Sequence, residues 1–390
     1  MITEAMNDSM GGPEQRPPGE EMTLAILYRE ELKEYDFGPG HPFRGDRYEI
    51  FPKFLQEKLP AKNHYQFLKA EWASDEDLQL ICRREYIEFS SMYYRSANLG
   101  QEYGSLFLQF HSGDNRPHGR PGKLEEAARL IVGQAKKACD LVEKGKFPKA
   151  VCLGGGMHHA KPTCGEGFCV YNDVAFAGKY LLQKYGLQKI LILDTDAHAG
   201  NGTAEYFYED PRVLFIDIHQ DPHTLYPGTG FTHQIGEKEG KGYTINLPMP
   251  MQAGDDSYRL AFDEVILPVA SAFKPQIILR NGGSDPHYSD NLTNLGLTLK
   301  GFRMMGEKVR EMAQICGGKA VDMIGSGYNK EILPHAWLAL ISGLADFAFP
   351  LEEPAHIPAQ RGEGSAYEET KGMIREVKGM LKDYWSCLSK

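Results

Sequence analysis

The sequence lacks a hydrophobic run that would predict a transmembrane segment, and its first residues lack the basic start and apolar centre of an export signal. It also lacks an excess of positive charge: 53 Asp and Glu residues outnumber 43 Lys and Arg residues, giving a formal net charge of −10. An acidic balance argues against a surface built to bind nucleic acid or anionic lipid. We therefore expect a cytoplasmic protein without a membrane or nucleic-acid partner.

Cysteine pairs with metal-binding spacing are also missing. The seven cysteines are scattered and no C-x-x-C occurs, which argues against a structural zinc finger. An odd number of unpaired cysteines in a long chain indicates free thiols in a reducing compartment. The 390 residues are 42% hydrophobic and 25% charged, which is ordinary globular usage and excludes disorder of the whole chain.

The sequence does contain a regular alternation of apolar runs and helical patterns. Short apolar runs, of the kind buried in parallel sheets, occur at 22–28, 150–153, 190–193, 213–218, 276–279 and 320–324. Segments with helical character occur at 76–89, 123–145, 172–185 and 257–273. This alternation predicts an α/β fold with a mostly parallel sheet and helices on both faces.

The composition changes towards both ends of the chain. It predicts four parts: a flexible leader at 1–21, a domain at 22–349, a linker rich in Pro, Gly and charge at 350–366, and a C-terminal helical segment at 367–390. The helix expected at 367–385 carries apolar residues on one face: Ile374, Val377, Leu381 and Tyr384. We expect this face to pack back onto the domain. The sequence leaves the oligomeric state open.

Ionisable residues collect directly after the predicted strands. Asp194, Asp196 and His198 follow one strand at every second position, so an extended backbone points them the same way. Such groups after a buried strand are costly unless they are paired or bind a metal. A later strand leads through glycines to Asp285. Because parallel strands end at one crevice, we expect Asp196, His198 and Asp285 to form a three-ligand site with an open position, as in catalytic zinc centres.

Two further strands deliver polar side chains to the same edge. Residues 154–159 (GGGMHH) bring His158 and His159, and residues 325–328 (GSGY) bring Tyr328. Taken alone, each is more usually a glycine turn with a structural histidine or a loop tyrosine. Beside a metal, however, these residues indicate metal-assisted hydrolysis. In such a reaction a histidine takes a proton from water and returns it to the leaving group, and a tyrosine donates a hydrogen bond to the oxyanion.

Six sequence blocks in this order resemble the zinc-dependent histone deacetylase family, which includes prokaryotic deacetylase-like and acetoin-utilisation proteins: GGGMHHA, GFCVYNDVA, DTDAHAGNG, YPGTG, GGSD and GSGY. The resemblance covers roughly residues 22–345, so that residues 22–349 are expected to form the catalytic domain. It implies the arginase/deacetylase fold, a single eight-stranded, mostly parallel sheet between helices. It also implies a zinc-dependent amidohydrolase (Fe²⁺ or cobalt would suit the same ligands) that removes acetyl groups from lysine side chains.

The resemblance assigns roles to the residues already singled out. Asp196, His198 and Asp285 match the metal ligands, and Tyr328 matches the oxyanion donor. The remaining catalytic positions are the tandem His158 and His159, with Asp194 behind the first and Asn201 behind the second. Many relatives have an aspartate at the second of these positions. Because asparagine carries no charge, we expect His159 to be less basic than it would be beside a carboxylate.

Further positions match the family's substrate channel. Phe168 and Tyr226 match the walls of the acyl-lysine tunnel, Gly167 its floor, and Leu292 its mouth. Two more residues match positions around it: Asp114, at a rim site that holds substrate backbone amides, and Arg47, near an internal acetate channel. A flat apolar tunnel suits the methylene stem of lysine.

The resemblance also implies potassium, in two groups of residues. The first comprises Asp194, Asp196, His198, Asp217 and Ile218, and the second comprises Phe207, Asp210, Val213 and Tyr243. Asp217 stands where a serine is common, so the charge of the first site is expected to differ. Arg280 and His287 are further departures from the family pattern to which the sequence assigns no role.

Three other functions are compatible with parts of this pattern. An arginase-type enzyme with two manganese ions needs aspartates where this chain has Gly200 and His287, so it is poorly supported. A small-molecule deacetylase acting on acetylpolyamines or related amides would share the whole core, and the sequence separates it poorly from a lysine deacetylase. An inactive scaffold is disfavoured because every catalytic position is retained.

Overall fold

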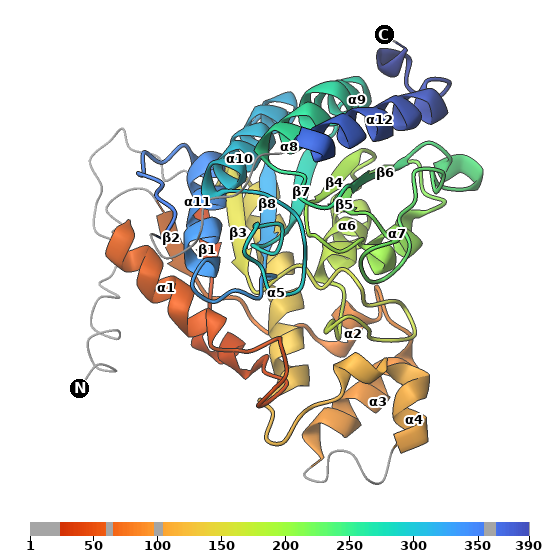
Figure 1. Ribbon diagram of the computed structural model, residues 1–390. Helices are drawn as coiled ribbons and strands as arrows, with labels where there is room; N and C mark the ends of the chain where they lie inside the picture. Colours follow the sequence, from red (N-terminus) through yellow and green to blue (C-terminus); the bar gives the residue numbers. More distant parts are fainter. Residues whose placement is uncertain (1–23, 60–64, 97–103, 355–363, 390) are drawn as a thin grey trace.

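The computed structural model describes residues 24–59, 65–96, 104–354 and 364–389. In this part of the chain, eight strands form one sheet in the order β2-β1-β3-β8-β7-β4-β5-β6, and every neighbouring pair is parallel (Figure 1). The strands are β1 (Leu24–Leu27), β2 (Tyr65–Leu68), β3 (Lys149–Leu153), β4 (Ile190–Asp194), β5 (Val213–Gln220), β6 (Thr244–Met249), β7 (Ile277–Gly282) and β8 (Ala320–Ile324). The predicted α/β fold with a single parallel sheet is confirmed. The predicted leader at 1–21 lies outside the described residues.

The two strands that the sequence pattern missed form the edges of this sheet. β2 is partly exposed over its four residues, and β6 contains Pro248. Edge strands tolerate both features, because one side needs no hydrogen-bond donor and the exposed side chains face solvent. A continuous apolar run marks only a strand with neighbours on both sides, such as β4, whose five residues are all buried.

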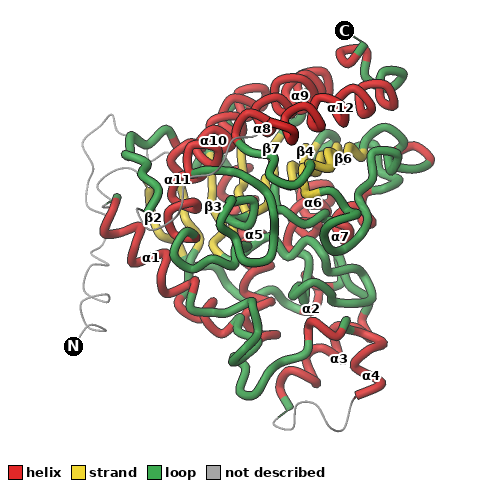
Figure 2. The backbone as a smooth tube through the Cα atoms, viewed as in Figure 1, coloured by secondary structure: helices red, strands yellow, loops and turns green. Residues whose placement is uncertain are grey.

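Helices cover both faces of the sheet, and Figure 2 shows the strands enclosed between them. α5 (Leu124–Glu143) packs with α6 (Asp173–Lys184) on one face, and α10 (Leu299–Ala313) packs with α11 (Leu333–Ala345) on the other. The other α-helices are α1 (Arg47–Lys58), α2 (Asp75–Leu78), α3 (Arg84–Arg95), α4 (Gly104–Phe110), α7 (Asn201–Phe207), α8 (Asp255–Ala261), α9 (Leu267–Phe273) and α12 (Gly364–Leu381).

The prediction of one helix over 76–89 is wrong, because α2 ends at Leu78 and α3 begins at Arg84. Ser74 caps α2 by accepting a hydrogen bond from the backbone N–H of Asp77 at 3.2 Å. After this short helix, the backbone N–H of Arg83 donates to the carbonyl of Pro162 at 2.8 Å. A contact with a distant loop thus replaces the intrahelical bond that would have continued the helix.

The C-terminal helix α12 packs against α8 and β6. Ile374, Val377 and Leu381 are buried as predicted, but Tyr384 is 43% exposed, so its place on the buried face was wrong. The helix ends at Leu381 and the chain then turns, which buries Trp385 instead. The indole N–H of Trp385 donates to the carbonyl of Gly242 at 2.7 Å. Most of the predicted linker at 350–366 lies outside the described residues.

Arg280, one of the unexplained departures in the sequence, lies in the core of the sheet. Its guanidinium on β7 forms an ion pair with Asp322 on the neighbouring strand β8, and both side chains are almost fully buried. A second guanidinium nitrogen donates to the Thr195 hydroxyl at 3.3 Å. The pair therefore links β8, β7 and the chain just after β4, directly beneath the ends of the strands.

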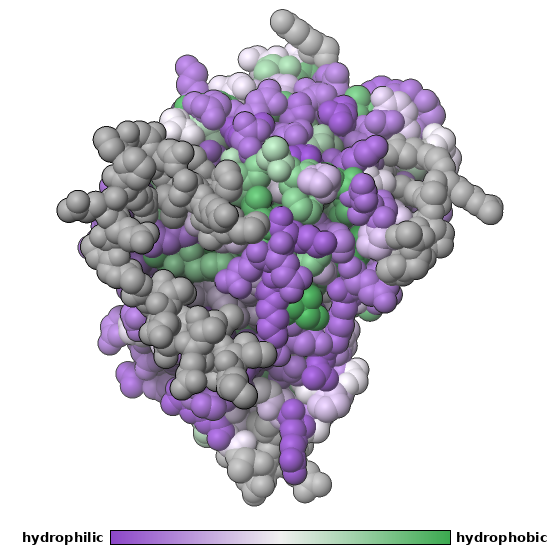
Figure 3. All heavy atoms as spheres, turned by 90° about the vertical axis from the view of Figure 1, so that its left-hand side faces the viewer, coloured by the Kyte–Doolittle hydropathy of each residue, from purple (hydrophilic) through white to green (hydrophobic). Residues whose placement is uncertain are grey.

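The outer surface carries mainly polar side chains on the face seen from the side of α1 and α11. Hydrophilic residues dominate the described part of this face, with smaller hydrophobic areas between them (Figure 3). Among the described helices, none combines the length and apolar character that a membrane span requires.

Candidate active site

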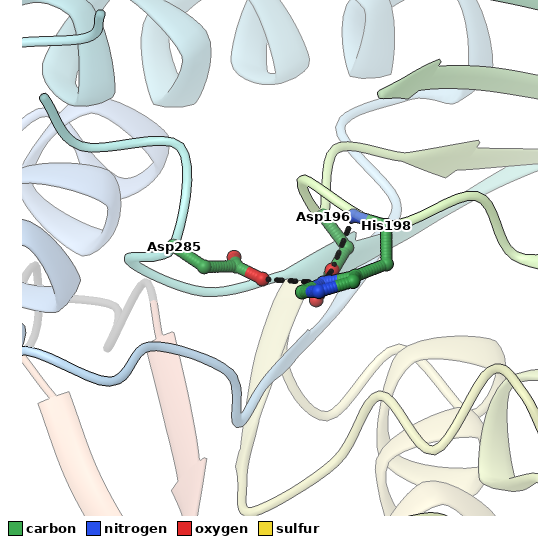
Figure 4. A group of neighbouring side chains, drawn as sticks. All are labelled: Asp196, His198 and Asp285. Atoms are coloured by element: carbon green, nitrogen blue, oxygen red, sulfur yellow. Dashed lines mark hydrogen bonds and ion pairs between the residues drawn. The ribbon is translucent and has the colours of Figure 1, made fainter. Parts of the chain in front are cut away.

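Two carboxylates and one imidazole converge at the carboxyl end of the sheet (Figure 4). Asp196 and His198 follow β4, and Asp285 follows β7, which is the neighbour of β4 in the sheet. His198 Nδ1 lies 3.0 Å from Asp196 Oδ1 and 3.2 Å from Asp285 Oδ2. Their three candidate ligand atoms all lie within 4.8 Å of one another, and all three side chains are buried. The pairing of β4 with β7 thus brings together residues that are 87 positions apart.

The electrostatics of this group favour a bound cation. Burial and the neighbouring Asp196 raise the pKa of Asp285 to about 7. Burial would also raise the pKa of Asp196, but His158 and His198 hold it well below its usual range. Two buried carboxylates are costly without a positive charge between them. Oxygen and imidazole ligands suit zinc and other divalent transition metals, so this group could bind a metal.

The paired histidines lie beside the group of three. A turn through Gly154 and Gly156, both with positive φ, leads from β3 to His158 and His159. The Nε2 atoms of the two imidazoles are 3.1 Å apart. His158 Nδ1 contacts Asp194 Oδ2 at 2.8 Å, and His159 Nδ1 contacts Asn201 Oδ1 at 2.7 Å. Each imidazole therefore presents Nε2 to the site and is held from behind through Nδ1.

Different partners give the two histidines opposite pKa shifts. Burial alone would lower the pKa of His158, but Asp194 and Asp196 raise it to about 9. Burial and the two neighbouring histidines His158 and His198 lower the pKa of His159 well below its usual value. The contact with Asn201 acts in the opposite direction and raises the pKa of His159, but burial outweighs it. The two imidazoles of the pair therefore differ in basicity, with His158 the stronger base.

Tyr328 lies on the glycine loop after β8, close to His198 of the candidate metal-binding group. Its ring centroid is 6.3 Å from that of His198 and 6.2 Å from that of Phe168. The same loop is tied to Asp285, whose Oδ1 accepts a hydrogen bond from the Ser326 hydroxyl at 2.7 Å. Burial, with the nearby carboxylates of Asp285 and Asp196, raises the pKa of Tyr328 well above its usual value. The phenol is therefore a neutral hydrogen-bond donor.

A small cavity of about 20 Å³ lies among these groups. Its lining residues are Phe43, Gly156, Met157, His158, His159, Gly167, Cys169, Asp196, His198, Gly325, Ser326 and Tyr328. Parts of the chain far from the paired histidines, such as Phe43, Gly325 and Ser326, thus help to complete its wall. Arg47 lies next to it, with its guanidinium donating to the Gly325 carbonyl at 2.8 Å and stacked over the Phe43 ring at 3.9 Å.

The chain resembles known deacetylases along most of its length. The family model described as the histone deacetylase domain matches residues 41–344. The chain belongs to the histone deacetylase family. A probable deacetylase from Archaeoglobus fulgidus is 35% identical over 374 residues, which cover 94% of this chain and 99% of the relative. The acetoin utilization protein AcuC of Staphylococcus xylosus is 35% identical over 333 residues, which cover 82% of this chain and 83% of the relative.

A solved structure supports the same family. The crystal structure of the HDA15 HD domain superposes with a TM-score of 0.79 at 25% identity, covering 94% of this chain and 97% of that one. The eight-stranded parallel sheet is therefore the arginase/deacetylase fold implied by the sequence resemblance. As a member of this family, the chain is a hydrolytic deacetylase.

Of the predicted tunnel residues, only Gly167 lines the small cavity. The ring of Tyr226 packs edge-on to His159 at 5.1 Å, and Phe168 adopts a positive φ of 65°. Tyr226 is 43% exposed and Leu292 is 40% exposed. Asp114 contacts the turn that carries Gly167, because its Oδ2 accepts a hydrogen bond from the Gly167 N–H at 3.1 Å.

The two residue groups that resemble potassium sites lie at opposite ends of β5. Asp194 and Asp217 are register partners near the carboxyl ends of β4 and β5. The Asp217 carboxylate contacts His219 Nδ1 and accepts from the Gly200 N–H, both at 2.8 Å. The other group occupies the turn before β5, where the carboxylate of Asp210 is bound by Arg212 at 2.6 Å. The first group also contains Asp196, His198 and Ile218. The second group also contains Phe207, Val213 and Tyr243.

The two-metal alternative finds no support among the described residues. Asp196, His198 and Asp285 are the single group there with three or more convergent metal-ligand side chains. Gly200 offers no side chain, and His287 contacts Ser289 Oγ at 2.8 Å and Glu353 Oε2 at 3.2 Å. Both ring nitrogens of His287 are therefore engaged away from the metal-ligand group.

Sequence reasoning missed two acidic residues that contact this site. Asp290 accepts a hydrogen bond from the backbone of Tyr328, and Glu166 accepts one from the side-chain amide of Asn201. Glu166 directly precedes Gly167, the first residue of the recognised block GFCVYNDVA, and this position was the one available signal. Neither contact follows from spacing, because the partners are 38 and 35 residues apart.

Proposed function

We propose that this deacetylase removes acetyl groups from lysine side chains of proteins, with zinc held by Asp196, His198 and Asp285. The observation that carries the proposal is the convergence of these three buried side chains beside the paired histidines and Tyr328. A zinc ion at such a site polarises the substrate carbonyl and lowers the pKa of water. Fe²⁺ suits the same ligands.

The paired histidines would handle the protons of the reaction. His159 is neutral, and its Nδ1 faces the amide oxygen of Asn201 at 2.7 Å. The Nε2 lone pair is then free to accept a proton from the attacking water. His158, whose Nδ1 contacts the Asp194 carboxylate at 2.8 Å, would be the more basic of the two imidazoles. The imidazole that takes the proton from water would then return it to the amine nitrogen as the C–N bond breaks.

Tyr328 would stabilise the oxyanion that forms when water attacks the acetyl carbonyl. A phenol with a raised pKa stays neutral and keeps its proton available as a donor. The buried site strengthens this hydrogen bond, because little water competes for it. Arg47, next to the cavity beyond Tyr328, is placed to attract the acetate product.

The substrate assignment rests on the predicted tunnel and rim residues. Phe168 and Tyr226 offer aromatic surfaces for the four methylene groups of a lysine, and Asp114 offers a carboxylate for backbone amides of a peptide. The exposed side chains of Tyr226 and Leu292 leave an open mouth that a protein substrate can reach. We also propose that potassium binds at the two residue groups near the ends of β5. We propose a reducing cytoplasmic setting as well, because none of the seven cysteines forms a disulfide.

The proposal is tested by measuring turnover of acetyl-lysine peptides and of acetylpolyamines on one sample with known metal content. We expect higher kcat/KM for the peptides, loss of activity with a chelator, and recovery with zinc. Higher kcat/KM for acetylpolyamines would show that the substrate is a small acetylated amine and not a protein. Activity that survives complete removal of metal would reject the mechanism.

A further inference from the structure

Asn201 can hold His159 in two ways, and only one of them supports proton transfer. An amide presents either its oxygen or its NH₂ group to a neighbour. If the oxygen faces His159, Nδ1 must carry the hydrogen and Nε2 keeps its lone pair. If the NH₂ group faces His159, Nδ1 becomes the acceptor and Nε2 carries the hydrogen. The second tautomer cannot accept a proton at the atom that faces the site.

The structure contains a group that selects the first orientation. The Asn201 Nδ2 atom donates to Glu166 Oε1 at 2.5 Å. The Lys161 ammonium lies 3.1 Å from the same oxygen. An ionised carboxylate accepts hydrogen bonds and donates none. Glu166 therefore requires the NH₂ group on its side, which leaves Asn201 Oδ1 for His159 Nδ1 at 2.7 Å.

We propose that Glu166 is a positioning residue that fixes the amide of Asn201 and thereby the tautomer of His159. Lys161, Glu166, Asn201 and His159 form a continuous chain of contacts from the surface to the catalytic cavity. The side chains of Lys161 and Glu166 are 26% and 18% exposed, so this chain begins at the rim of the site. The inference rests on the proposed deacetylation, whose proton transfer it refines.

The geometry separates this role from two simpler ones. The backbone of Glu166 is held independently of its side chain, because its carbonyl accepts the N–H of Cys169 at 2.9 Å. Replacement of the side chain therefore leaves the turn that carries Gly167 and Phe168 supported. A role in attracting a cationic substrate would act on KM, whereas a tautomer role acts on kcat.

The decisive experiment compares Glu166→Ala with the double variant Glu166→Ala/Asn201→Asp. We expect Glu166→Ala to lower kcat about tenfold with KM within about twofold of wild type, since a positioned base contributes roughly 10²–10⁴-fold and only part of it is lost. An aspartate at 201 can only accept, so it restores the required tautomer without Glu166. We therefore expect the double variant to recover at least about fivefold in kcat over Glu166→Ala. Glu205→Ala, which removes an exposed carboxylate one turn along α7, is the charge-matched control and should keep wild-type kcat.

The proposal is overturned if Glu166→Ala keeps full kcat, if it changes KM alone, or if Asn201→Asp brings no recovery in a variant that folds and binds metal normally. A second readout does not depend on turnover. In protein with ¹⁵N-labelled histidine, the His159 signals, assigned by their loss in His159→Asn, should show the hydrogen on Nδ1 in wild type and a mixture of tautomers in Glu166→Ala. Identical spectra of the two proteins would reject the positioning role, whatever the substrate. A wild-type protein that does not deacetylate lysine would reject the proposed function alone.

Discussion

The carboxylate of Asp290 accepts a hydrogen bond from the backbone N–H of Tyr328 across 2.8 Å. Asp290 belongs to the loop after β7, which also carries Asp285, whereas Tyr328 belongs to the loop after β8. Asp285 in turn accepts from the Ser326 hydroxyl at 2.7 Å. The loop with the proposed metal ligand Asp285 and the loop with the phenol are therefore bound to each other at two points.

This relationship predicts that Asp290 positions Tyr328. Asp290→Ala should lower kcat about tenfold, because the phenol loses its fixed direction towards the oxyanion while metal binding persists. Steady-state kinetics and elemental analysis on the same sample test this. If the variant loses its metal, Asp290 supports the ligand loop rather than the tyrosine.

Tyr328→Phe should lower turnover by roughly 10²–10³-fold, the usual cost of removing one oxyanion donor, and should keep its metal. The ring still fills its place, so stability should change little. Tyr384→Phe, at an exposed tyrosine just beyond the end of α12, serves as the control and should behave as wild type. Full activity of Tyr328→Phe would remove the phenol from the mechanism.

Asp285→Ala should abolish metal binding, because it removes one of three ligands and leaves an imbalance of charge in a buried group. Elemental analysis of the purified variant should find far less than one equivalent of zinc. Glu205→Ala, which removes an exposed carboxylate instead, should retain one equivalent. A full equivalent in Asp285→Ala would refute the ligand assignment.

Gly167→Ala should impair catalysis by displacing His159. Gly167 has a φ of +59°, and an added Cβ would lie 2.2 Å from His159 Cδ2. The imidazole would have to move by more than an ångström, which can cost about 10²-fold in kcat. Kinetics with peptide substrate check this, with Gly372→Ala on the outer helix α12 as a control, since a Cβ there meets only the end of Arg375 at 3.9 Å. Unchanged kcat would place His159 outside the reaction.

His111 should make folding sensitive to acid. Burial lowers the pKa of His111 to about 3, and its Nε2 contacts the Ser90 hydroxyl at 3.0 Å. The unfolded chain binds a proton below its ordinary pKa of about 6.5, whereas the folded protein does not until pH nears the lowered value. The free energy of unfolding therefore falls as pH drops below about 6.5, by up to ~1.4 kcal/mol per pH unit from this residue.

Urea unfolding of wild type and His111→Phe at pH 7.5 and pH 5 tests this sign. The aromatic replacement suits a position stacked on Phe107 at 5.1 Å. The loss of stability between the two pH values should be about 1–2 kcal/mol smaller in the variant. Equal losses would show that His111 is protonated at pH 5 in the folded protein.

The sequence predicted the inner strands of the sheet and the candidate ligand residues that follow them, for one physical reason. A strand with neighbours on both sides is buried throughout, so β3, β4, β7 and β8 appear as continuous apolar runs. Edge strands carry no such mark, and β2 and β6 were missed. The helix at 76–89 was wrong because a contact with Pro162, far away in sequence, interrupts it.

Alternation along one extended segment was enough to place Asp196 and His198 on the same side, since backbone geometry alone decides that. The meeting of these residues with Asp285 depends on the pairing of β4 with β7, and the meeting of Glu166 with Asn201 depends on how the turn after β3 lies against the start of α7. Such contacts join segments that come together only when the sheet closes over its core. Local sequence thus specified which groups this deacetylase carries, whereas the packing of distant segments decided which of them touch, and with which atoms.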